Sequence, residues 1–336
     1  MVTIREVAAD AGVARSTVSY VLSGNKRMSD ETIRRVMTSV KKLGYRPSAA
    51  ARALALNRTN VLGLLTQTSS HHTDDDIDIF MRFIRAAMLT ASERGFDLLV
   101  TSKNADDLRG DILVDAVVVM DVRMQDDRLP LLSDWGIPTV LIGMPADTHR
   151  LSAVDLDFEA AARAMVAYLV GLGHRQLAVL GWSEPSVPPL AWQERFRQGF
   201  EAECLRANVR GYLEPCGDSR EGVLRWLDGV LEAMPGVTGI LVSAASTLVH
   251  LMAATRERGL SVPDDVSIIA LAPDDVFALK HPDISLVDLP GQRMVQWAVN
   301  QVLDELAGAP SGRREFIAPV IAIRSSTGPA PSPDRG

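Results

Sequence analysis

Residues 3–22 of the chain, TIREVAADAGVARSTVSYVL, contain the local signals that decide the fold of its first part. Thr3 and Glu6 have the spacing of a capping box, in which each side chain bonds the backbone amide of the other residue. Apolar residues then recur at helical spacing up to Gly12, which suits the left-handed conformation that ends a helix. After a three-residue turn, a second helix is predicted at about 15–22. Two helices joined by so tight a turn are typical of a helix-turn-helix.

A third helix is predicted from Ser29, whose hydroxyl suits an N-cap, to Gly44, which suits the position after a helix end. The apolar residues at helical spacing form the expected buried faces: Val18, Val21 and Leu22 in the second helix, and Ile33, Val36, Met37, Val40 and Leu43 in the third. We therefore expect residues 1–45 to form a small all-α domain.

Residues 46–59 are rich in alanine and contain Pro47 near their start, a composition that favours a short helix. An isolated helix of this length is marginal in water because its nucleation is unfavourable. We expect a hinge helix here that becomes ordered only when another surface supports it.

From Val61 onward, apolar runs typical of buried strands alternate with amphipathic helices. The predicted strands lie at 61–65, 96–100, 116–120, 138–142, 176–181, 239–243, 266–272 and 284–289, and the predicted helices at 158–171, 190–207, 221–234, 246–258 and 291–307. Such alternation indicates α/β architecture with parallel sheets covered on both faces. The length of this part favours two doubly wound lobes over one. Residues 327–336 are rich in proline and are expected to form a disordered tail.

Charge is unevenly distributed along the chain. Residues 1–60 contain eleven lysines and arginines against four acidic residues, whereas the whole chain has a net charge of −7. A basic first segment on an acidic body indicates a polyanionic partner for that segment alone.

The composition excludes several classes of protein. Hydrophobic residues make up 47% of the chain, which excludes global disorder, and no apolar run is long enough to span a membrane. Residues 1–12 contain charges and lack the apolar stretch of a secretory signal. Cys204 and Cys216 provide neither a disulfide framework nor a cysteine-based zinc site. We therefore expect a cytoplasmic protein that does not contact a membrane.

Motifs of common enzymes are absent from the sequence. The chain has no G-x-x-x-x-G-K-[ST] phosphate loop, no G-x-G-x-x-G after its first strand and no G-x-S-x-G elbow. The cluster at 71–76, HHTDDD, contains metal-ligating residue types, but sequence neighbours rarely converge on one ion. We therefore expect no catalytic residues, no metal and no cofactor.

Three motifs follow one another in the first sixty residues: T-I-x-x-V-A-x-x-A-G-V, S-T-V-S-x-V-L and L-G-Y-x-P-S-x-x-A-R-x-L. In these motifs the chain resembles the DNA-binding region of the LacI/GalR family of bacterial transcriptional repressors. The body is similar to the family's effector domain, which has a fold like periplasmic binding proteins of type I, at residues 154–161, 169–181, 256–269 and 272–275. The chain departs from the family at Ala14, where a serine usually caps the recognition helix.

The resemblance implies an effector-binding and dimerisation domain at 60–326. Its two lobes are expected to exchange segments of the chain: an N-lobe at about 60–157 and 289–319, and a C-lobe at about 158–288 and 320–326.

A recognition helix places the residues at its N-terminus against base edges in the major groove. In the second helix these are Arg15, Ser16 and Tyr20, and the guanidinium of Arg15 suits guanine. The hydroxyl and amide side chains suited to phosphate contacts are those of Thr3, Thr17, Ser19, Asn25 and Ser29, although Thr17 and Ser19 also fit plain helix surface.

The resemblance also assigns a role to the hinge. It implies that Leu54 inserts between bases in the minor groove, while Ser48, Ala51 and Ala55 line the contact. Leu56 is an alternative wedge, and burial against a partner hinge is compatible with either role.

For the effector, the resemblance points to Asp274 and Arg195 in the cleft between the lobes. The spacing before Gly199 is off by one residue, so Arg197 is an alternative to Arg195. Ala244, Ala245 and Gly143 replace polar residues of many family members. Trp182 and Trp192 are alternative sugar-stacking residues or simply core.

Together these patterns predict a ligand-responsive repressor that binds double-stranded DNA at a palindromic operator as a homodimer. A sugar or sugar derivative is the expected effector, and helix 78–93 with the 290–307 region is the expected dimer surface. The alternatives are a periplasmic solute receptor and an enzyme acting on a sugar or nucleotide. The missing leader and the basic head oppose the first, and the missing motifs oppose the second.

Overall fold

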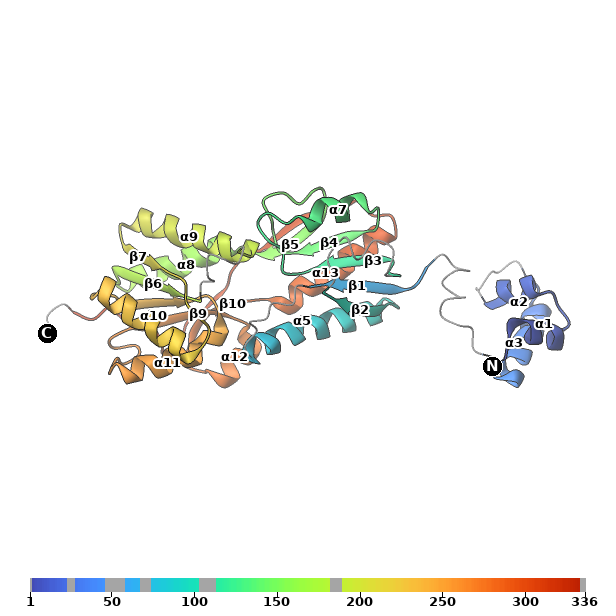
Figure 1. Ribbon diagram of the computed structural model, residues 1–336, viewed down its shortest axis with the longest axis horizontal. Helices are drawn as coiled ribbons and strands as arrows, with labels where there is room; N and C mark the ends of the chain where they lie inside the picture. Colours follow the sequence, from blue (N-terminus) through green and yellow to red (C-terminus); the bar gives the residue numbers. More distant parts are fainter. Residues whose placement is uncertain are drawn as a thin grey trace.

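The computed structural model describes residues 2–22, 28–45, 58–66, 74–102, 113–181 and 189–332, apart from the side chains of 74–78 and Val276. A helical head (residues 2–45) precedes an elongated body (58–332) made of two lobes, an N-lobe and a C-lobe (Figure 1). The predicted helical head and two α/β lobes are confirmed. Predicted hinge residues 46–57 lie outside the described residues.

The head has three helices: α1 (Ile4–Ala11), α2 (Arg15–Leu22) and α3 (Asp30–Leu43). The capping box of Thr3 and Glu6 is present in both directions, and Ser29 caps α3. Gly12 and Gly44 end their helices in the left-handed region, each with a φ of 63°. The local signals therefore place these helix ends correctly.

The buried face of α3 differs from the prediction at one position. Met37 is 49% exposed, whereas Ser39 is buried. Ser39 and Lys42 both hydrogen bond to Asp10 of α1, so polar contacts between the two helices set the rotation of α3. The remaining predicted positions of α2 and α3 lie in the core of the head or pack against it.

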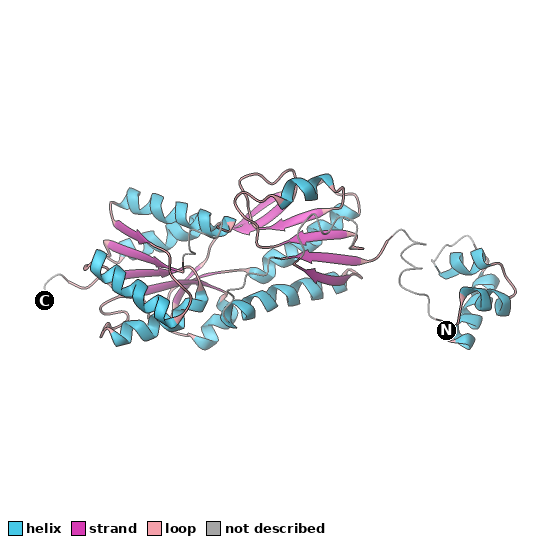
Figure 2. Cartoon of the chain, in the orientation of Figure 1, coloured by secondary structure: helices cyan, strands magenta, loops and turns pink. Residues whose placement is uncertain are grey.

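The N-lobe contains a parallel sheet in the order β11-β5-β4-β3-β1-β2. Its strands are β1 (Val61–Leu65), β2 (Asp97–Thr101), β3 (Ala116–Val119), β4 (Thr139–Ile142), β5 (Ser152–Leu156) and β11 (Arg314–Ile317). Helices α5 (Asp74–Glu93) and α13 (Gly291–Leu306) pack together on one face, and α7 (Arg128–Asp134) covers the other. Figure 2 shows this layering in both lobes.

The C-lobe repeats the arrangement in the order β12-β10-β9-β8-β6-β7. Its strands are β6 (Gln176–Leu180), β7 (Arg210–Leu213), β8 (Gly239–Val242), β9 (Ser267–Ala272), β10 (Ser285–Asp288) and β12 (Ile321–Ala322). Helices α8 (Phe158–Gly171) and α9 (Ala191–Ala207) cover one face, and α10 (Arg220–Ala233) and α11 (Leu248–Glu257) cover the other. The short helices η1 (Ala245–Thr247) and α12 (Asp274–Lys280) follow β8 and β9.

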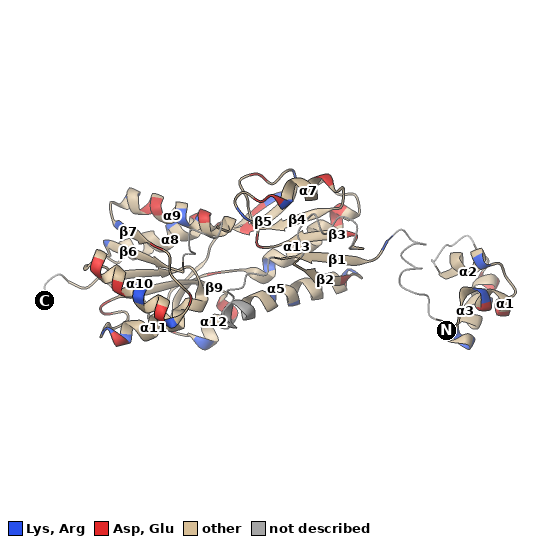
Figure 3. Ribbon diagram, viewed as in Figure 1, with Lys and Arg blue, Asp and Glu red and all other residues tan. Residues whose placement is uncertain are grey.

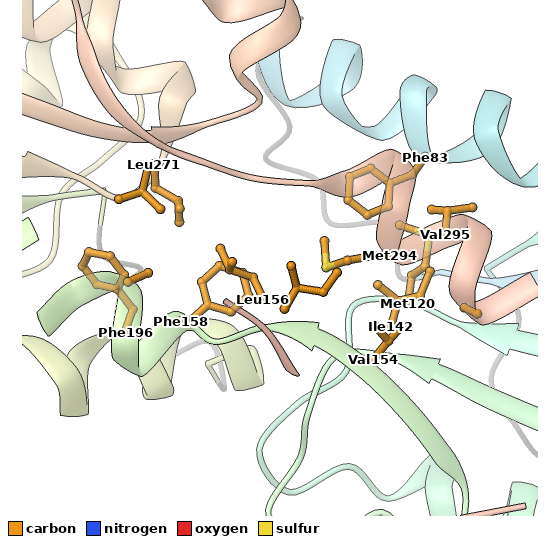
Figure 4. Close-up of a cluster of buried hydrophobic side chains, with 14 of the residues drawn as sticks. Phe83, Met120, Ile142, Val154, Leu156, Phe158, Phe196, Leu271, Met294 and Val295 are labelled. Atoms are coloured by element: carbon orange, nitrogen blue, oxygen red, sulfur yellow. The ribbon is translucent and has the colours of Figure 1, made fainter. Parts of the chain in front are cut away.

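The chain crosses between the lobes three times: after β5, after β10 and after β11. A row of buried apolar side chains, among them Phe83, Leu156, Phe158 and Phe196, runs along these crossings from one lobe into the other (Figure 4). The lobes therefore share one hydrophobic core at the crossings.

The body differs from the sequence predictions in its short elements and at its C-terminal end. Strands β5, β7, β11 and β12 and the short helices α7 and α12 were not predicted, and β12 pairs antiparallel with β10. The expected disorder from 327 onward is wrong for residues 327–330, because hydrogen bonds hold these residues against the C-lobe. Gly328 bonds Ser267 and His174, and the amide of Ala330 donates to Leu172.

Candidate DNA interface and inter-lobe site

Helix α2 presents a polar face to solvent and an apolar face to the head. Arg15 and Ser16 are exposed at its first turn and Tyr20 is 49% exposed, whereas Val18 and Val21 are buried. The helix begins directly after Ala14, whose methyl group offers no acceptor to the first amides. The three predicted base-contact residues therefore lie on solvent-facing turns of one helix.

Among the residues predicted to contact phosphates, Thr3 and Ser29 have exposed hydroxyls that also serve as helix caps. The Thr3 hydroxyl donates to Glu6 over 2.9 Å, and that of Ser29 lies 2.9 Å from the Thr32 hydroxyl. Thr17 and Ser19 are half-buried on α2, and Asn25 lies outside the described residues. The phosphate contacts stay predictions.

Two of the basic residues in the head, Arg35 and Lys42, bond to other residues of the head; Figure 3 marks where basic and acidic residues lie along the ribbon. The Arg35 guanidinium donates to the carbonyls of Ala11, at 2.6 Å, and Gly12, at 3.0 Å, and so satisfies the end of α1. Lys42 pairs with Asp10 at 2.7 Å, and this hydrogen bond lowers the pKa of the Asp10 carboxyl. Sequence reasoning missed both roles because the partners are 23 to 32 positions apart.

The hinge residues Ser48, Ala51, Leu54, Leu56 and Ala55 all lie outside the described residues. The same holds for Trp182 and for the first three residues of the 71–76 cluster, His71, His72 and Thr73.

Within the described part of the chain, no group of three or more histidine, cysteine or acidic side chains is arranged to hold a metal ion. No helix among these residues has the length and apolar character needed to cross a bilayer.

Asp274 is the first residue of α12, and its carboxylate is ion-paired with Arg324. Its amide donates to Asp288 at the end of β10 over 2.9 Å. Burial raises the pKa of the Asp288 carboxyl, and the negative charges of Asp274 and Asp275 add to that rise. Asp274 therefore lies in a small cluster of charged side chains, and effector binding by it stays a prediction.

The two alternative arginines of α9 have different partners. The Arg195 guanidinium reaches the N-lobe, where it donates to the carbonyl of Met144 over 2.8 Å and to that of Pro145 over 3.4 Å. Arg197 instead bonds Glu194 and Glu201 of its own helix. Those acidic partners raise its pKa, so Arg197 is a cation paired within the C-lobe. Arg195 alone of the two joins the lobes.

Gly143, one of the positions where the chain departs from the family, lies where packing leaves no room for a side chain. Gly143 has a φ of 131°, and a Cβ there would lie 2.9 Å from the Cβ of Val122, so a larger residue does not fit. Ala245 is buried in η1. The Trp192 ring packs on Phe158 with 5.5 Å between ring centroids, which places it against the core.

Sequence reasoning also missed Asp155, a buried acid in β5. Its two carboxylate oxygens accept hydrogen bonds from the amides of Met144, at 2.9 Å, and Leu156, at 3.0 Å. Burial raises the pKa of this carboxyl to about 7, against the opposing effect of the two amides and of the Arg195 charge. A single acid within an apolar strand has no distinguishing sequence pattern.

Comparison with known proteins matches both parts of the chain. Residues 3–48 match the family of bacterial regulatory proteins called lacI, and residues 166–327 match the periplasmic binding protein-like domain. The chain is 29% identical over 324 residues to the HTH-type transcriptional regulator CelR of Thermobifida fusca, with 91% of this chain and 92% of that protein covered. It is 26% identical over 341 residues to the HTH-type transcriptional repressor PurR of Haemophilus influenzae (strain PittEE), with 97% and 98% covered.

Solved structures share the fold over nearly the whole chain. The Lac repressor dimer bound to operator and the anti-inducer ONPF has a TM-score of 0.80 at 19% identity, covering 97% of this chain and 99% of that one. The CelR–cellobiose complex has a TM-score of 0.68 at 22% identity, covering 97% and 100%. Because the head and the body both match, in the same order and within one chain, the protein belongs to the LacI family of bacterial regulatory proteins.

Proposed function

We propose that this protein is a ligand-responsive transcriptional repressor that acts in the cytoplasm and binds a palindromic DNA operator as a homodimer. The observation that supports this best is the polar face of α2, where Arg15, Ser16 and Tyr20 are exposed opposite the buried Val18 and Val21. A helix anchored in this way presents base-reading side chains without loss of the core.

A dimer is part of the proposal because one recognition helix reads only a few base pairs. The N-lobe has an exposed apolar surface suited to a second copy of the chain, which we call the α5–β2 surface. It consists of Met81, Met88 and Leu89 of α5 and Val100 of β2, and exposed Leu99 lies next to it on the opposite face of the same edge strand. The exposed positions of α13 are polar instead, with Gln292, Gln296 and Asn300 among them, so we place the interface on α5 and β2.

The effector part of the proposal is a sugar or sugar derivative that binds between the lobes. Ligands of open α/β folds bind outside the carboxyl ends of the strands, where the two lobes meet. The solved complex of CelR with cellobiose supports a sugar as the ligand class. Asp274 and Arg195 are the proposed contact residues. Arg195 also bonds carbonyls of the N-lobe.

An operator selected from random DNA tests the DNA-binding part. Arg15→Ala should weaken binding to the selected sequence by about 1–3 kcal/mol, or roughly 5- to 150-fold, because a bidentate contact to a base is lost. Binding to random DNA, which depends on phosphate contacts, should change much less. Fluorescence anisotropy with both DNAs measures the difference.

The matched control is Arg225→Ala, which removes one positive charge from an exposed arginine on α10 of the C-lobe. It should leave both affinities unchanged. Equal weakening on selected and random DNA in Arg15→Ala would show that this side chain contacts phosphate rather than a base.

A further inference from the structure

We propose that Arg195 is a positioning residue that latches the two lobes together and thereby sets the lobe arrangement that the DNA-binding head senses. The first support is its set of partners, all of which belong to the N-lobe while Arg195 belongs to the C-lobe. They are the carbonyls of Met144 and Pro145 and the ring of Phe316 on β11, 5.4 Å from the guanidinium carbon. Hydrogen bonds from a charged donor are stronger than those between neutral groups.

The N-lobe side of this latch is held in place before Arg195 reaches it. The Asp155 carboxylate accepts from the amide of Met144, so Arg195 bonds a residue whose position is already held. The amide of Ala146 donates to Met124 over 3.0 Å, and Gly143 packs so tightly on Val122 that a side chain would not fit. The two loops that follow β3 and β4 therefore form one rigid acceptor.

The C-lobe side is equally constrained. A Cβ on Gly199 would lie 2.3 Å from the carbonyl oxygen of Glu159, so α9 and α8 are in backbone contact one turn beyond Arg195. Helix α8 begins at Phe158, directly after the chain leaves β5 and Asp155. Arg195 therefore lies on the C-lobe side of the crossing from β5 to α8, and the loop that accepts its hydrogen bonds lies on the N-lobe side of the same crossing.

A backbone contact beside Arg195 extends the latch. The amide of Ala191, at the first turn of α9, donates to the carbonyl of Val122 over 2.8 Å, and Arg123 and Leu190 form an isolated antiparallel bridge. Any movement of the C-lobe away from the N-lobe at this place must break these bonds together. Tightly packed contacts of this kind switch between discrete arrangements rather than deforming gradually.

A molecule bound between the lobes acts on DNA affinity only if it binds one lobe arrangement better than another. Because Arg195 bonds both carbonyls in the joined arrangement, it biases the equilibrium between arrangements even before an effector is added. This role rests on the proposed function only for its DNA readout, since the lobe arrangement itself is measurable without DNA.

The test compares Arg195→Ala, Arg195→Lys and the matched control Arg197→Ala. Arg197 lies two positions along the same helix and bonds only acids of α9 among the contacts described above. Spin labels on Asp134→Cys of the N-lobe and Leu205→Cys of the C-lobe report the distance between lobes. A Cys216→Ser background leaves Cys204, whose pKa is raised to about 12 by burial, as an unreactive thiol.

We expect Arg195→Ala to broaden or shift the inter-lobe distance distribution and to change operator affinity without effector by about fivefold or more, the lower end of typical couplings between sites. Arg195→Lys keeps the charge and reaches one carbonyl, so it should fall between Arg195→Ala and the parent. Arg197→Ala should match the parent in both measurements.

The proposal is overturned if Arg195→Ala, folded as judged by its circular dichroism and thermal unfolding, keeps the parent distance distribution and operator affinity. Should Arg195→Ala not fold, Arg195→Lys decides in its place by the same two measurements. If the parent protein binds no selected DNA, the proposed function fails, and the distance distributions still decide whether Arg195 is a latch.

Discussion

The two lobes of the body have the same strand order but different outer surfaces. In the N-lobe the edge strand β2 and the adjacent helix α5 expose the apolar α5–β2 surface. The corresponding edge strand of the C-lobe, β7, begins with exposed Arg210 and Gly211, and α9, which contacts β7, has one strongly exposed apolar residue, Leu205. The same strand order therefore does not fix the outer surface of a lobe, because the surface residues of a fold vary independently of its core.

Each lobe also buries a side chain whose pKa is shifted toward its neutral form. In the N-lobe this residue is Asp155 of β5, and in the C-lobe it is His174, two residues before β6. Burial favours the neutral form of either side chain, and that form is reached at low pH for an acid and at high pH for a base. The contributions of Asp155 and His174 to stability should therefore change with pH in opposite directions.

Substitution of the N-lobe surface should have the largest effect. Met88→Lys places a charge within the proposed dimer contact, and desolvation of that charge costs about 3 kcal/mol, or roughly a 150-fold increase in the dimer dissociation constant. Sedimentation velocity across a concentration series measures this constant.

The matched change in the C-lobe is Leu205→Lys, at a residue that is 84% exposed. We expect the dimer dissociation constant of the Leu205→Lys variant to equal that of the parent protein. A dimer that tolerates Met88→Lys but dissociates in Leu205→Lys would place the interface on α9 and reverse the comparison between the lobes.

The second effect concerns Asp155. Because its pKa in the folded protein is raised from 3.8 to about 7, the folded state binds the proton more tightly than the unfolded chain. Its contribution to stability is complete below pH 3.8 and is lost as pH rises through 7. The free energy of unfolding of the parent should therefore fall by at most about 4 kcal/mol over this range relative to Asp155→Asn.

Urea unfolding at several pH values checks this difference, and the parent serves as the reference for all other titrating groups. Parallel pH profiles for the parent and Asp155→Asn would mean that Asp155 ionises in the folded protein as it does in the unfolded chain.

The smallest effect should come from His174. Its Nδ1 lies 2.8 Å from the Thr238 hydroxyl and its Nε2 lies 3.1 Å from the carbonyl of Gly328, so the ring connects the C-terminal segment to the lobe. Burial lowers the pKa of His174, which means that its contribution to stability is present above the ordinary value of 6.5 and is lost as pH falls below it.

His174→Gln should remove this loss of stability, which thermal unfolding between pH 7 and pH 5 measures. The half-buried His250 of α11 provides the control variant His250→Gln. A parent whose stability does not fall in this range, or a control that behaves like His174→Gln, would contradict the assignment.

Most helices were predictable from the sequence, and so were the central strands. Helix α8 begins and ends where its apolar spacing predicts, and the Gly12 and Gly44 ends follow from the preference of glycine for positive φ. The edge strands β7, β11 and β12 were missed because they are short and only half-buried, which removes the continuous apolar run. Strand β5 was missed because Asp155 interrupts its apolar residues.

The sequence by itself determined the helix-turn-helix, its family and the alternation of strands and helices, since caps, periodicity and motifs act within about ten neighbouring residues. The tertiary structure alone decided which arginine of α9 joins the lobes, because Arg195 and Met144 are 51 positions apart. It likewise decided that Arg35 caps α1 and that residues 327–330 are held against the C-lobe. These contacts depend on where distant segments meet, and no local pattern encodes that position.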